Sequence, residues 1–254
     1  MEDLVGKQAL VTGGGSGIGA SIAEMLAKRG AHVIVNDIDE DAAREVASKI
    51  QGTILVSDVG LPNSEGLVGQ LANRTMAIDI LINNAGFQHI ASIDALSLEV
   101  WNKAIQVMLT GPFLLTKYVL PGMRAKRWGR IINVASIYGK VAAPFKGAYV
   151  AVKHGIIGLT RVAALETAKD GITVNAICPG FANTRLIEHQ LERLAEAYKI
   201  QPQQALEEIM LKQVPSGRLL SPSSIASLVG FLCSDQASDI TAQALTIDGG
   251  TIQV

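Results

Sequence analysis

Short runs of β-branched and other apolar residues alternate along this chain with longer stretches in which apolar residues recur at helical spacing. Such alternation is typical of repeated β-α-β units, whose parallel strands are buried on both faces and are therefore apolar throughout. The pattern predicts strands at residues 9–11, 33–36, 54–57, 80–83, 130–135, 173–177 and 244–247. It predicts helices at residues 17–29, 39–50, 62–75, 98–127, 148–169 and 222–234.

One stretch breaks this rhythm. Residues 181–220 are polar and helix-rich, and an insertion beyond the carboxyl end of a strand is where a lid over a ligand would lie. There is no linker or low-complexity tract, and 254 residues with 48% hydrophobic content suffice for one large core. We therefore expect one α/β domain over residues 1–254, a Rossmann-type doubly wound parallel sheet of about seven strands with helices on both faces.

Charge and cysteine usage narrow the functional classes. A formal net charge of -1 gives no general attraction to nucleic acid or acidic membranes. Cys178 and Cys233 are too few for a disulfide framework, and residues 1–7 carry acids where a signal peptide would carry bases. No apolar run approaches the roughly 18 residues of a membrane span. We expect a cytoplasmic protein that binds neither nucleic acid nor a membrane.

A glycine-rich turn follows the first predicted strand and runs directly into a helix. Gly13, Gly17 and Gly19 permit backbone conformations and close approaches that a Cβ would block, so a pyrophosphate can rest on amides at the helix N-terminus. Of the general dinucleotide pattern, only the looser Gly-x-Gly-x-x-Ala form is present, from Gly15 to Ala20. Strand, turn, helix and a second strand ending in an acid together predict a dinucleotide site.

The acid is Asp37, about 20 residues after the glycines. A carboxylate there accepts hydrogen bonds from both ribose hydroxyls and repels a 2′-phosphate, which predicts NAD rather than NADP. The alternative is that Asp37 caps the following helix.

The ends of the third and fourth predicted strands lie at the same carboxyl edge and suit the adenine and the adjacent ribose. They carry Asp58, Val59, Asn84, Ala85 and Gly86. The alternative that Asn83 or Asn84 is a structural turn residue stays open.

A phenol and an ammonium share one helix face, because Tyr149 and Lys153 are four residues apart. A phenol titrates near ~10 unaided, and a nearby cation would stabilise its phenolate. Ser136, at the end of an apolar run, adds a hydroxyl for a substrate oxygen. Together the three residues predict proton transfer to or from an alcohol. A solvated Tyr–Lys pair on a helix surface is the alternative.

These motifs resemble those of the short-chain dehydrogenase/reductases. The Gly-rich turn from Thr12 to Gly19, Asn83-Asn-Ala-Gly86, Ser136, Tyr149-x-x-x-Lys153 and Cys178-Pro-Gly180 occur in that family's order over nearly the whole chain. The resemblance implies hydride transfer to or from a nicotinamide. It implies that Tyr149 is the acid/base, that Lys153 lowers the pKa of Tyr149 and holds the nicotinamide ribose, and that Ser136 anchors the substrate oxygen.

The resemblance also implies the remaining cofactor contacts and the assembly. Besides the aspartates, the strand-end residues and the catalytic residues named above, the residues implied to contact the cofactor are Thr12, Gly13, Ser16, Gly17, Ile18, Gly19, Pro179, Gly180 and Thr184. The assembly implied is a homotetramer built on the helices that contain residues 98–127 and 148–169.

Within the family, the chain looks like the bacterial D-3-hydroxybutyrate dehydrogenases, in which the residues matching Gln88, Lys146 and Gln190 hold the substrate carboxylate. The chain departs from that group at Tyr138, where the group has a histidine, and lacks its usual C-terminal tryptophan. The resemblance implies interconversion of D-3-hydroxybutyrate and acetoacetate with NAD. Alternatives are another hydroxy acid, a polyol or sugar, a 3-oxoacyl substrate, or an NAD(H) sensor without turnover. Lys146 as a plain surface lysine stays open.

Other polar residues carry weaker signals. Met108 stands where many family members have an asparagine that anchors a water for proton relay; packing in the core is the alternative, and Gln106 points to a different helix face. The basic cluster at residues 123–130 suits an acidic carrier protein or simply a solvated helix end. The histidines show no metal-ligand spacing, so we expect no metal.

Overall fold

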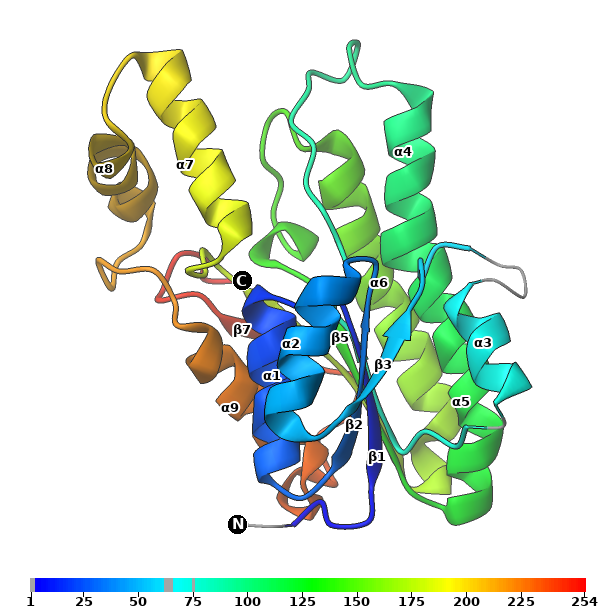
Figure 1. Ribbon diagram of the computed structural model, residues 1–254. Coiled ribbons are helices and arrows are strands. Elements are labelled where there is room, and N and C mark those ends of the chain that lie inside the picture. Colours follow the sequence, from blue (N-terminus) through cyan, green and yellow to red (C-terminus); the bar gives the residue numbers. More distant parts are fainter. Residues whose placement is uncertain (1–2, 62–65, 75) are drawn as a thin grey trace.

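The computed structural model describes residues 3–61, 66–74 and 76–254. Its centre is a parallel sheet of seven strands in the order β3-β2-β1-β4-β5-β6-β7, with helices on both faces (Figure 1). The strands are β1 (Gln8–Thr12), β2 (His32–Asp37), β3 (Thr53–Val56), β4 (Ile80–Asn83), β5 (Gly129–Val134), β6 (Ile172–Pro179) and β7 (Ala244–Ile247). The predicted fold class is confirmed.

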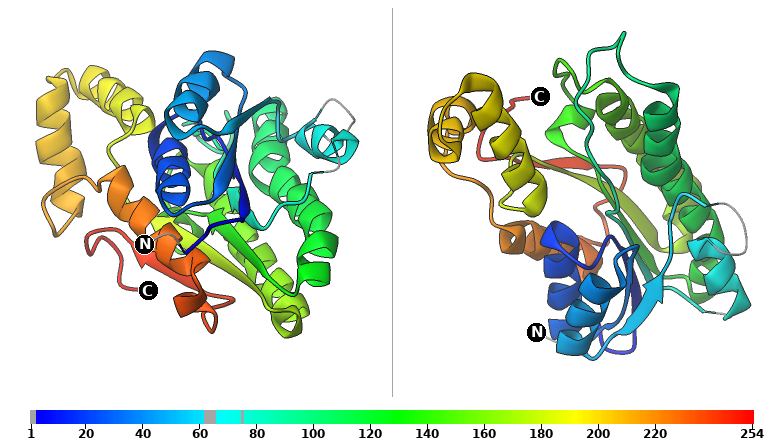
Figure 2. Two further views of the ribbon diagram at one scale, coloured as in Figure 1. Left: turned by 60° about the horizontal axis from the view of Figure 1, so that its bottom comes forward. Right: turned by 45° about the horizontal axis from the view of Figure 1, so that its top comes forward.

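The helices form two layers. Helices α1, α2 and α9 cover one face of the sheet and α3, α4, α5 and α6 the other (Figures 1 and 2). Their bounds are α1 (Gly17–Lys28), α2 (Glu40–Ile50), α3 (Leu67–Asn73), α4 (Leu98–Ile105), α5 (Gly111–Lys126), α6 (Gly147–Thr167), α7 (Arg185–Tyr198), α8 (Pro202–Gln204) and α9 (Pro222–Cys233).

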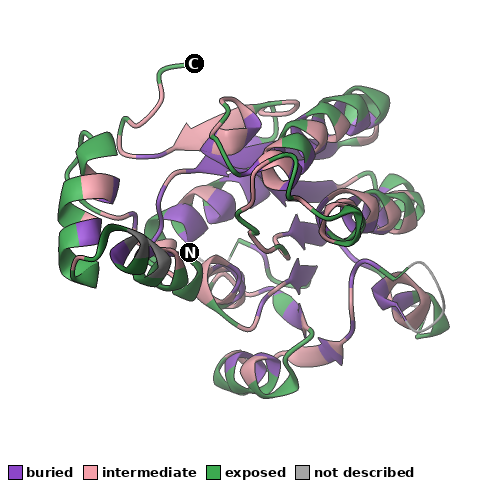
Figure 3. Cartoon of the chain, turned by 90° about the horizontal axis from the view of Figure 1, so that it is seen from above, coloured by how far each residue is buried: buried purple, intermediate pink, exposed green. Residues whose placement is uncertain are grey.

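Strand side chains alternate between the two layers, which explains why the strands are apolar throughout. In β1, Ala9 and Val11 pack toward α1 and α9, whereas Leu10 packs into the core beneath α5 and α6. Seen from above, the buried strands lie between helices whose outer faces are exposed (Figure 3).

The strand order reverses beside β1. Val11 of β1 is in register with Val35 of β2 on one side and Ile82 of β4 on the other. The chain builds outward from β1 to β3 in one direction and from β4 to β7 in the other. In open parallel sheets, the crevice at such a reversal, outside the carboxyl ends of the strands, is where ligands bind.

The predicted helix at residues 98–127 is interrupted, which corrects the expectation of one continuous helix. A π-helical turn, Gln106–Thr110, separates α4 from α5. Pro112 supplies no N–H to the ladder, and a Cβ on Gly111 would lie 2.6 Å from the Val59 carbonyl oxygen. The extra residue in the turn therefore accommodates both the proline and this close approach.

The predicted helix at residues 62–75 is present only in part as α3, since residues 62–65 and 75 lie outside the described residues.

Residues 181–220 form a small helical unit above the carboxyl edge of the sheet (Figure 1). A bridge between Ala182 and Leu220 closes its base. It has its own apolar cluster, which includes Ile187, Leu191 and Met210. The position is the one expected of a lid; its movement stays a prediction.

By length and composition alone, the helical stretch Gly147–Asp170, which has 24 residues, could cross a membrane. The expectation that no apolar stretch approaches that length is therefore wrong. The stretch is mainly α6, which buries Ile156, Ala163 and Ala164 against the sheet and carries a lysine into the interior. Those are the features of a core helix, which passes the same test.

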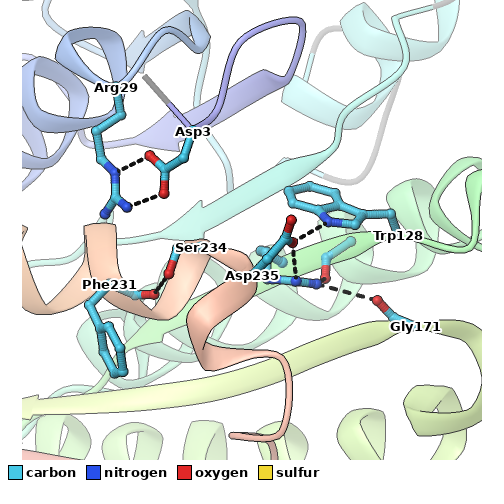
Figure 4. A network of polar contacts seen from close by, with 9 residues as sticks. Asp3, Arg29, Trp128, Gly171, Phe231, Ser234 and Asp235 are labelled. Atoms are coloured by element: carbon cyan, nitrogen blue, oxygen red, sulfur yellow. Dashed lines mark hydrogen bonds and ion pairs between the residues drawn. The ribbon is translucent and has the colours of Figure 1, made fainter. Parts of the chain in front are cut away.

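A polar network fixes the opposite edge of the sheet (Figure 4). The Trp128 indole lies between the Lys7 ammonium, 3.7 Å from its ring centroid, and the Arg130 guanidinium, 4.5 Å away. Trp128 and Arg130 both donate to one carboxylate oxygen of Asp235, at 3.1 and 3.2 Å. Because Arg130 is buried, this shared acceptor supplies the opposite charge that its guanidinium needs.

The basic cluster at residues 123–130 is largely paired within the chain. Arg124 pairs with Asp170 at 3.0 Å, Lys126 pairs with Asp79 at 2.5 Å, and Arg127 donates to the Lys169 carbonyl oxygen. Through these contacts the basic cluster attaches the C-terminal end of α5 to neighbouring elements.

Candidate functional site

A cavity of about 410 Å³ opens at the reversal point, beneath α7. The turn after β1, the ends of β2 to β6 and the first half of α7 supply its walls. It brings together these sequence-predicted site residues: Gly13, Ser16, Gly17, Ile18, Asp37, Asp58, Val59, Asn84, Ala85, Gly86, Gln88, Ser136, Lys146, Tyr149, Lys153, Pro179, Gly180, Thr184 and Gln190. Two further predicted cofactor residues, Thr12 and Gly19, do not line it.

The glycine turn has the geometry of a pyrophosphate cradle. Gly13 and Gly17 have φ of +60° and +54°, the left-handed region that favours glycine. A Cβ on Gly19 would lie 2.0 Å from the Gly13 carbonyl oxygen, so this residue lets the helix start against the turn. A Cβ on Gly17 would lie 3.2 Å from the Thr184 methyl group, which places the 179–184 loop over the turn. These residues fit a dinucleotide.

Thr12 and Asn84 tie the turn to β4. The Thr12 hydroxyl accepts hydrogen bonds from the amides of Asn84 and Ala85, at 2.9 and 3.0 Å. The Asn84 side chain donates to the carbonyl oxygens of Thr12 and Gly13. Thr12 therefore shapes the cavity from behind. The Asn84 side chain acts as a structural turn residue, which was the alternative to a role in cofactor binding. Asn83 donates to Asn133, beneath the site.

Asp37 faces the cavity at the end of β2. Its carboxylate accepts from the Gly15 amide at 3.0 Å and from the Asp39 amide at 3.2 Å, which fixes its orientation. The N-cap of α2 is Asp39, which accepts from the Ala42 amide. The alternative that Asp37 caps this helix is therefore wrong, and its carboxylate remains able to accept further hydrogen bonds from the cavity side.

A lysine that sequence reasoning missed lies at the same end. Lys103 of α4 lines the cavity and pairs with Asp58 at 2.5 Å, while the Gly60 amide donates to the other Asp58 oxygen. Burial raises the pKa of Asp58, but these two hydrogen bonds outweigh it and hold that pKa below its usual range. No local motif marks Lys103, because it is 45 residues from Asp58 in the sequence and only the fold brings the two side chains together.

Ser136, Tyr149 and Lys153 meet in the middle of the cavity. Ser136 follows β5, and its hydroxyl accepts from the Tyr138 amide at 3.1 Å. Tyr149 and Lys153 come from the first two turns of α6. Lys153 is 5% exposed; its ammonium donates to the Val134 carbonyl oxygen at 2.7 Å and lies 5.4 Å from the Tyr149 ring centroid. Lys153 is buried and Tyr149 is partly buried against the core, so a solvated helix pair is the wrong description.

Burial decides the charge states here. It raises the pKa of Tyr149 to about 12, opposed by a hydrogen bond with Ser136. It lowers the pKa of Lys153 to about 8. The direction for Tyr149 is opposite to the one that the family resemblance implies, because desolvation of the phenolate outweighs the hydrogen bond with Ser136. Tyr149 is therefore a protonated donor at neutral pH, suited to protonating a carbonyl oxygen.

A second buried lysine, Lys146, lines the same cavity. Lys146 is 7% exposed, and burial lowers its pKa to about 8. Its ammonium lies 4.3 Å from the centroid of the Tyr138 ring. Within residues 3–61, 66–74 and 76–254, no carboxylate forms a salt bridge with it. Lys146 is thus not a surface lysine, and Gln88 and Gln190 line the cavity with it.

Met108 is a core residue. It is buried in the cluster beneath α5 and α6, and a Cβ on Gly86 would lie 3.1 Å from its sulfur. Its neighbour Val107 lines the cavity instead. Gln106 is exposed and lies against Gly60, outside the cavity lining. The packing alternative for Met108 is confirmed.

The chain is similar along nearly its whole length to known proteins. A family model described as enoyl-(acyl carrier protein) reductase matches residues 13–251. A D-beta-hydroxybutyrate dehydrogenase of Cupriavidus necator is 45% identical over 98% of this chain and 99% of its own length. A 3-oxoacyl-(acyl-carrier-protein) reductase of Vibrio cholerae is 38% identical over 99% of this chain and 100% of its own.

The fold is also shared with a solved structure. A variant of actinorhodin polyketide ketoreductase, determined with NADPH, has a TM-score of 0.90 and 36% sequence identity, covering 96% of this chain and 97% of that chain. The relatives differ in the substrates that their names state. The choice among those substrates therefore rests on the residues of the cavity.

Proposed function

The chain belongs to the short-chain dehydrogenase/reductase family, and on that basis we propose that it is an NAD-dependent oxidoreductase that interconverts D-3-hydroxybutyrate and acetoacetate. The observation that carries the substrate assignment is Lys146. A buried ammonium that lines the cavity and has no carboxylate partner among the described residues needs an anionic ligand. A small hydroxy acid supplies that anion in the same cavity as Ser136 and Tyr149.

The cavity residues divide the reaction between them. NAD, when bound, would accept or return the hydride. In reduction, the Tyr149 phenol donates its proton to the carbonyl oxygen while the carbon gains the hydride, and Ser136 donates a hydrogen bond to the same oxygen. In oxidation, the substrate hydroxyl returns a proton to the Tyr149 phenolate, which the Lys153 ammonium stabilises.

Cofactor and substrate would occupy opposite ends of this cavity. The glycine turn would hold the pyrophosphate, Asp37 the adenosine ribose and Lys153 the nicotinamide ribose. Lys146 would hold the substrate carboxylate, with Gln88 and Gln190 as neutral donors. The 181–220 unit is proposed as the substrate lid, because it carries Gln190 above the cavity.

Two observations favour this assignment over the other functions that the sequence left open. An acidic carrier protein would bind best to unpaired surface cations, and Arg124, Lys126 and Arg127 of the basic cluster are paired within the chain. A sensor without turnover would not need Ser136 and Tyr149 together in the cavity beside Lys146.

The deciding experiment is a substrate panel monitored at the absorbance of the reduced nicotinamide. The panel contains D-3-hydroxybutyrate and its L-enantiomer, butane-1,3-diol, a sugar alcohol and, in reverse, a 3-oxoacyl thioester. We expect the highest kcat/KM with D-3-hydroxybutyrate and NAD. A preference for neutral alcohols would contradict the assignment, and no turnover with any member would favour the sensor.

Cofactor preference should depend on Asp37. Asp37→Ala removes an acceptor for the ribose hydroxyls and a charge that repels a 2′-phosphate. We expect the KM for NAD to rise roughly tenfold, on the scale of ~1.5–3 kcal/mol for a hydrogen bond to a charged group, and the discrimination against NADP to fall. Asp39→Ala is the matched control, since Asp39 caps α2 and does not line the cavity. A native enzyme that already uses NADP as well as NAD would contradict this role of Asp37.

Hydroxy-acid binding should weaken as the pH rises through about 8, the pKa to which burial lowers Lys146. Below that pH the ammonium is charged and attracts a carboxylate; above it the amine is neutral and does not. Because burial gives Lys153 a similar pKa, the measurement is the ratio of KM for 3-hydroxybutyrate to KM for butane-1,3-diol. Lys153 affects both substrates, so a ratio that does not change with pH would count against Lys146.

Assembly and location complete the proposal. Exposed apolar side chains on α5 and α6, among them Phe113, Val162 and Leu165, support a homotetramer built on these helices. Two free cysteines, both buried, are compatible with a cytoplasmic enzyme.

A further inference from the structure

Tyr138 stands where the resemblance leads us to expect a different residue, and its ring touches the proposed carboxylate subsite. The Lys146 ammonium lies over this ring, 4.3 Å from its centroid. Both residues line the cavity, and both are at least partly buried. The negative face of an aromatic ring attracts a cation, most strongly where water is excluded.

The ring has a fixed position relative to the reacting groups. The Tyr138 amide donates to the Ser136 hydroxyl at 3.1 Å, and the Gly139 amide donates to the Ser136 carbonyl oxygen at 2.9 Å. Gly139 packs closely on α6, because a Cβ there would lie 2.5 Å from the Lys153 carbonyl oxygen. The short turn that carries the ring is therefore held on Ser136 at one side and on the helix of Tyr149 and Lys153 at the other.

Lys146 needs such a support. It immediately precedes α6, and its backbone is held beside Ala91 by a bridge. Its long side chain has several rotatable bonds, and no carboxylate among the described residues orients it. Tyr138 supplies a planar surface for the ammonium at a set place in the cavity.

We infer that Tyr138 is a positioning residue for substrate specificity: its ring holds the Lys146 ammonium at a fixed separation from Ser136 and Tyr149, and thereby selects hydroxy acids over neutral alcohols. This inference rests on the proposed function. The ring face is the active part, and the hydroxyl is dispensable. The substrates selected in this way are short hydroxy acids, in which a few bonds of fixed number separate the carboxylate from the reacting hydroxyl.

Kinetics with two variants separate the ring from the hydroxyl. Tyr138→Leu removes the aromatic face at similar bulk and should raise the KM for 3-hydroxybutyrate roughly three- to tenfold, the scale of a partly desolvated cation–π contact, with kcat nearly unchanged. Tyr138→Phe keeps the face and should stay within about twofold of the wild-type KM. The KM for butane-1,3-diol should change little in either variant. Equal increases in both variants would overturn the inference, because the hydroxyl would then be the active part.

A double-mutant cycle tests the coupling to Lys146. In a Lys146→Ala background, Tyr138→Leu should add no further increase in the KM for 3-hydroxybutyrate. An increase as large as in the wild-type background would mean that Tyr138 acts without Lys146, and would overturn the inference.

Lysine NMR tests the contact without any substrate. In the protein labelled with ¹³C-lysine, the Lys146 side-chain signals should be shifted upfield by the ring, keep that shift in Tyr138→Phe and lose it in Tyr138→Leu. Signals missing in Lys146→Ala give the assignment, and Lys7, which lies over Trp128 at the far edge of the sheet, is the internal reference. An unchanged Lys146 shift in Tyr138→Leu would overturn the inference, whichever substrate the enzyme uses. If the shift is lost but the enzyme prefers neutral alcohols, the substrate assignment fails and the Tyr138–Lys146 contact stands.

Discussion

Tyr149→Phe should lower kcat by roughly 10²- to 10⁴-fold, close to a complete loss of turnover, while leaving NAD binding nearly intact. The substitution deletes the oxygen that transfers the proton and removes little surface. Burial raises the pKa of this phenol to about 12, so in the free protein it is a proton donor, and phenylalanine has none to give. The absorbance of the reduced nicotinamide gives kcat for oxidation and for reduction. A fluorescence titration gives the Kd of NADH.

The matched control is Tyr118→Phe. Tyr118 of α5 is also partly buried, and its hydroxyl donates to the Met76 carbonyl oxygen at 2.9 Å, outside the cavity lining. Its loss should leave turnover unchanged. A decrease of only a few-fold in kcat for Tyr149→Phe would rule out Tyr149 as the acid/base.

Sequence patterns predicted the sheet well because its inner strands are buried on both faces, as in β4 and β6, and the edge strands β3 and β7 are also apolar. Strands β4 and β7 have the predicted bounds, and β6 is longer by one residue at its start and two at its end. The interruption between α4 and α5 was missed. Apolar periodicity continues through the π-helical turn, and the turn depends on Gly111 meeting the Val59 carbonyl oxygen, a contact between distant parts of the chain.

The site residues also divide into those that local sequence predicts and those that depend on long-range contacts. Residues joined by local spacing, such as the glycine turn and the Tyr149–Lys153 pair, lie together in the cavity as the sequence suggested. Lys103 of α4 and Val107 of the π-helical turn were not predicted as site residues. Only the tertiary fold brings them to the cavity, and no local motif marks them. The direction of the Tyr149 pKa was also beyond reach of the motif, since it depends on how deeply the phenol is buried.

Lys146 shows why burial adds to a motif. In the sequence it is one lysine among twelve, with a surface position as an open alternative. In the structure it is a buried cation over an aromatic ring, and it lines the same cavity as the groups that would transfer the proton. A charge is removed from water at a cost, and a ligand of opposite charge offsets that cost.

Lys146→Ala should therefore raise the KM for 3-hydroxybutyrate by roughly tenfold or more, on the scale of ~1.5–3 kcal/mol for a charge-assisted hydrogen bond. Oxidation of butane-1,3-diol should scarcely change, because that substrate has no carboxylate. Gln88→Ala and Gln190→Ala should each cost less, since an amide can donate a hydrogen bond but carries no charge. Initial rates with both substrates, at a pH below 8 where Lys146 is protonated, give the comparison.

The control for general effects of losing a lysine is Lys140→Ala. Lys140 is near in sequence, but its ammonium donates to the Thr246 hydroxyl at 2.9 Å and does not line the cavity. Its loss should leave the KM for 3-hydroxybutyrate within about twofold, because Lys140 lies outside the cavity lining. If Lys146→Ala weakens the hydroxy acid and the diol equally, Lys146 does not hold a carboxylate. A polyol or sugar dehydrogenase would then be the better description, because Ser136, Tyr149 and Lys153 would still transfer the proton from an uncharged alcohol.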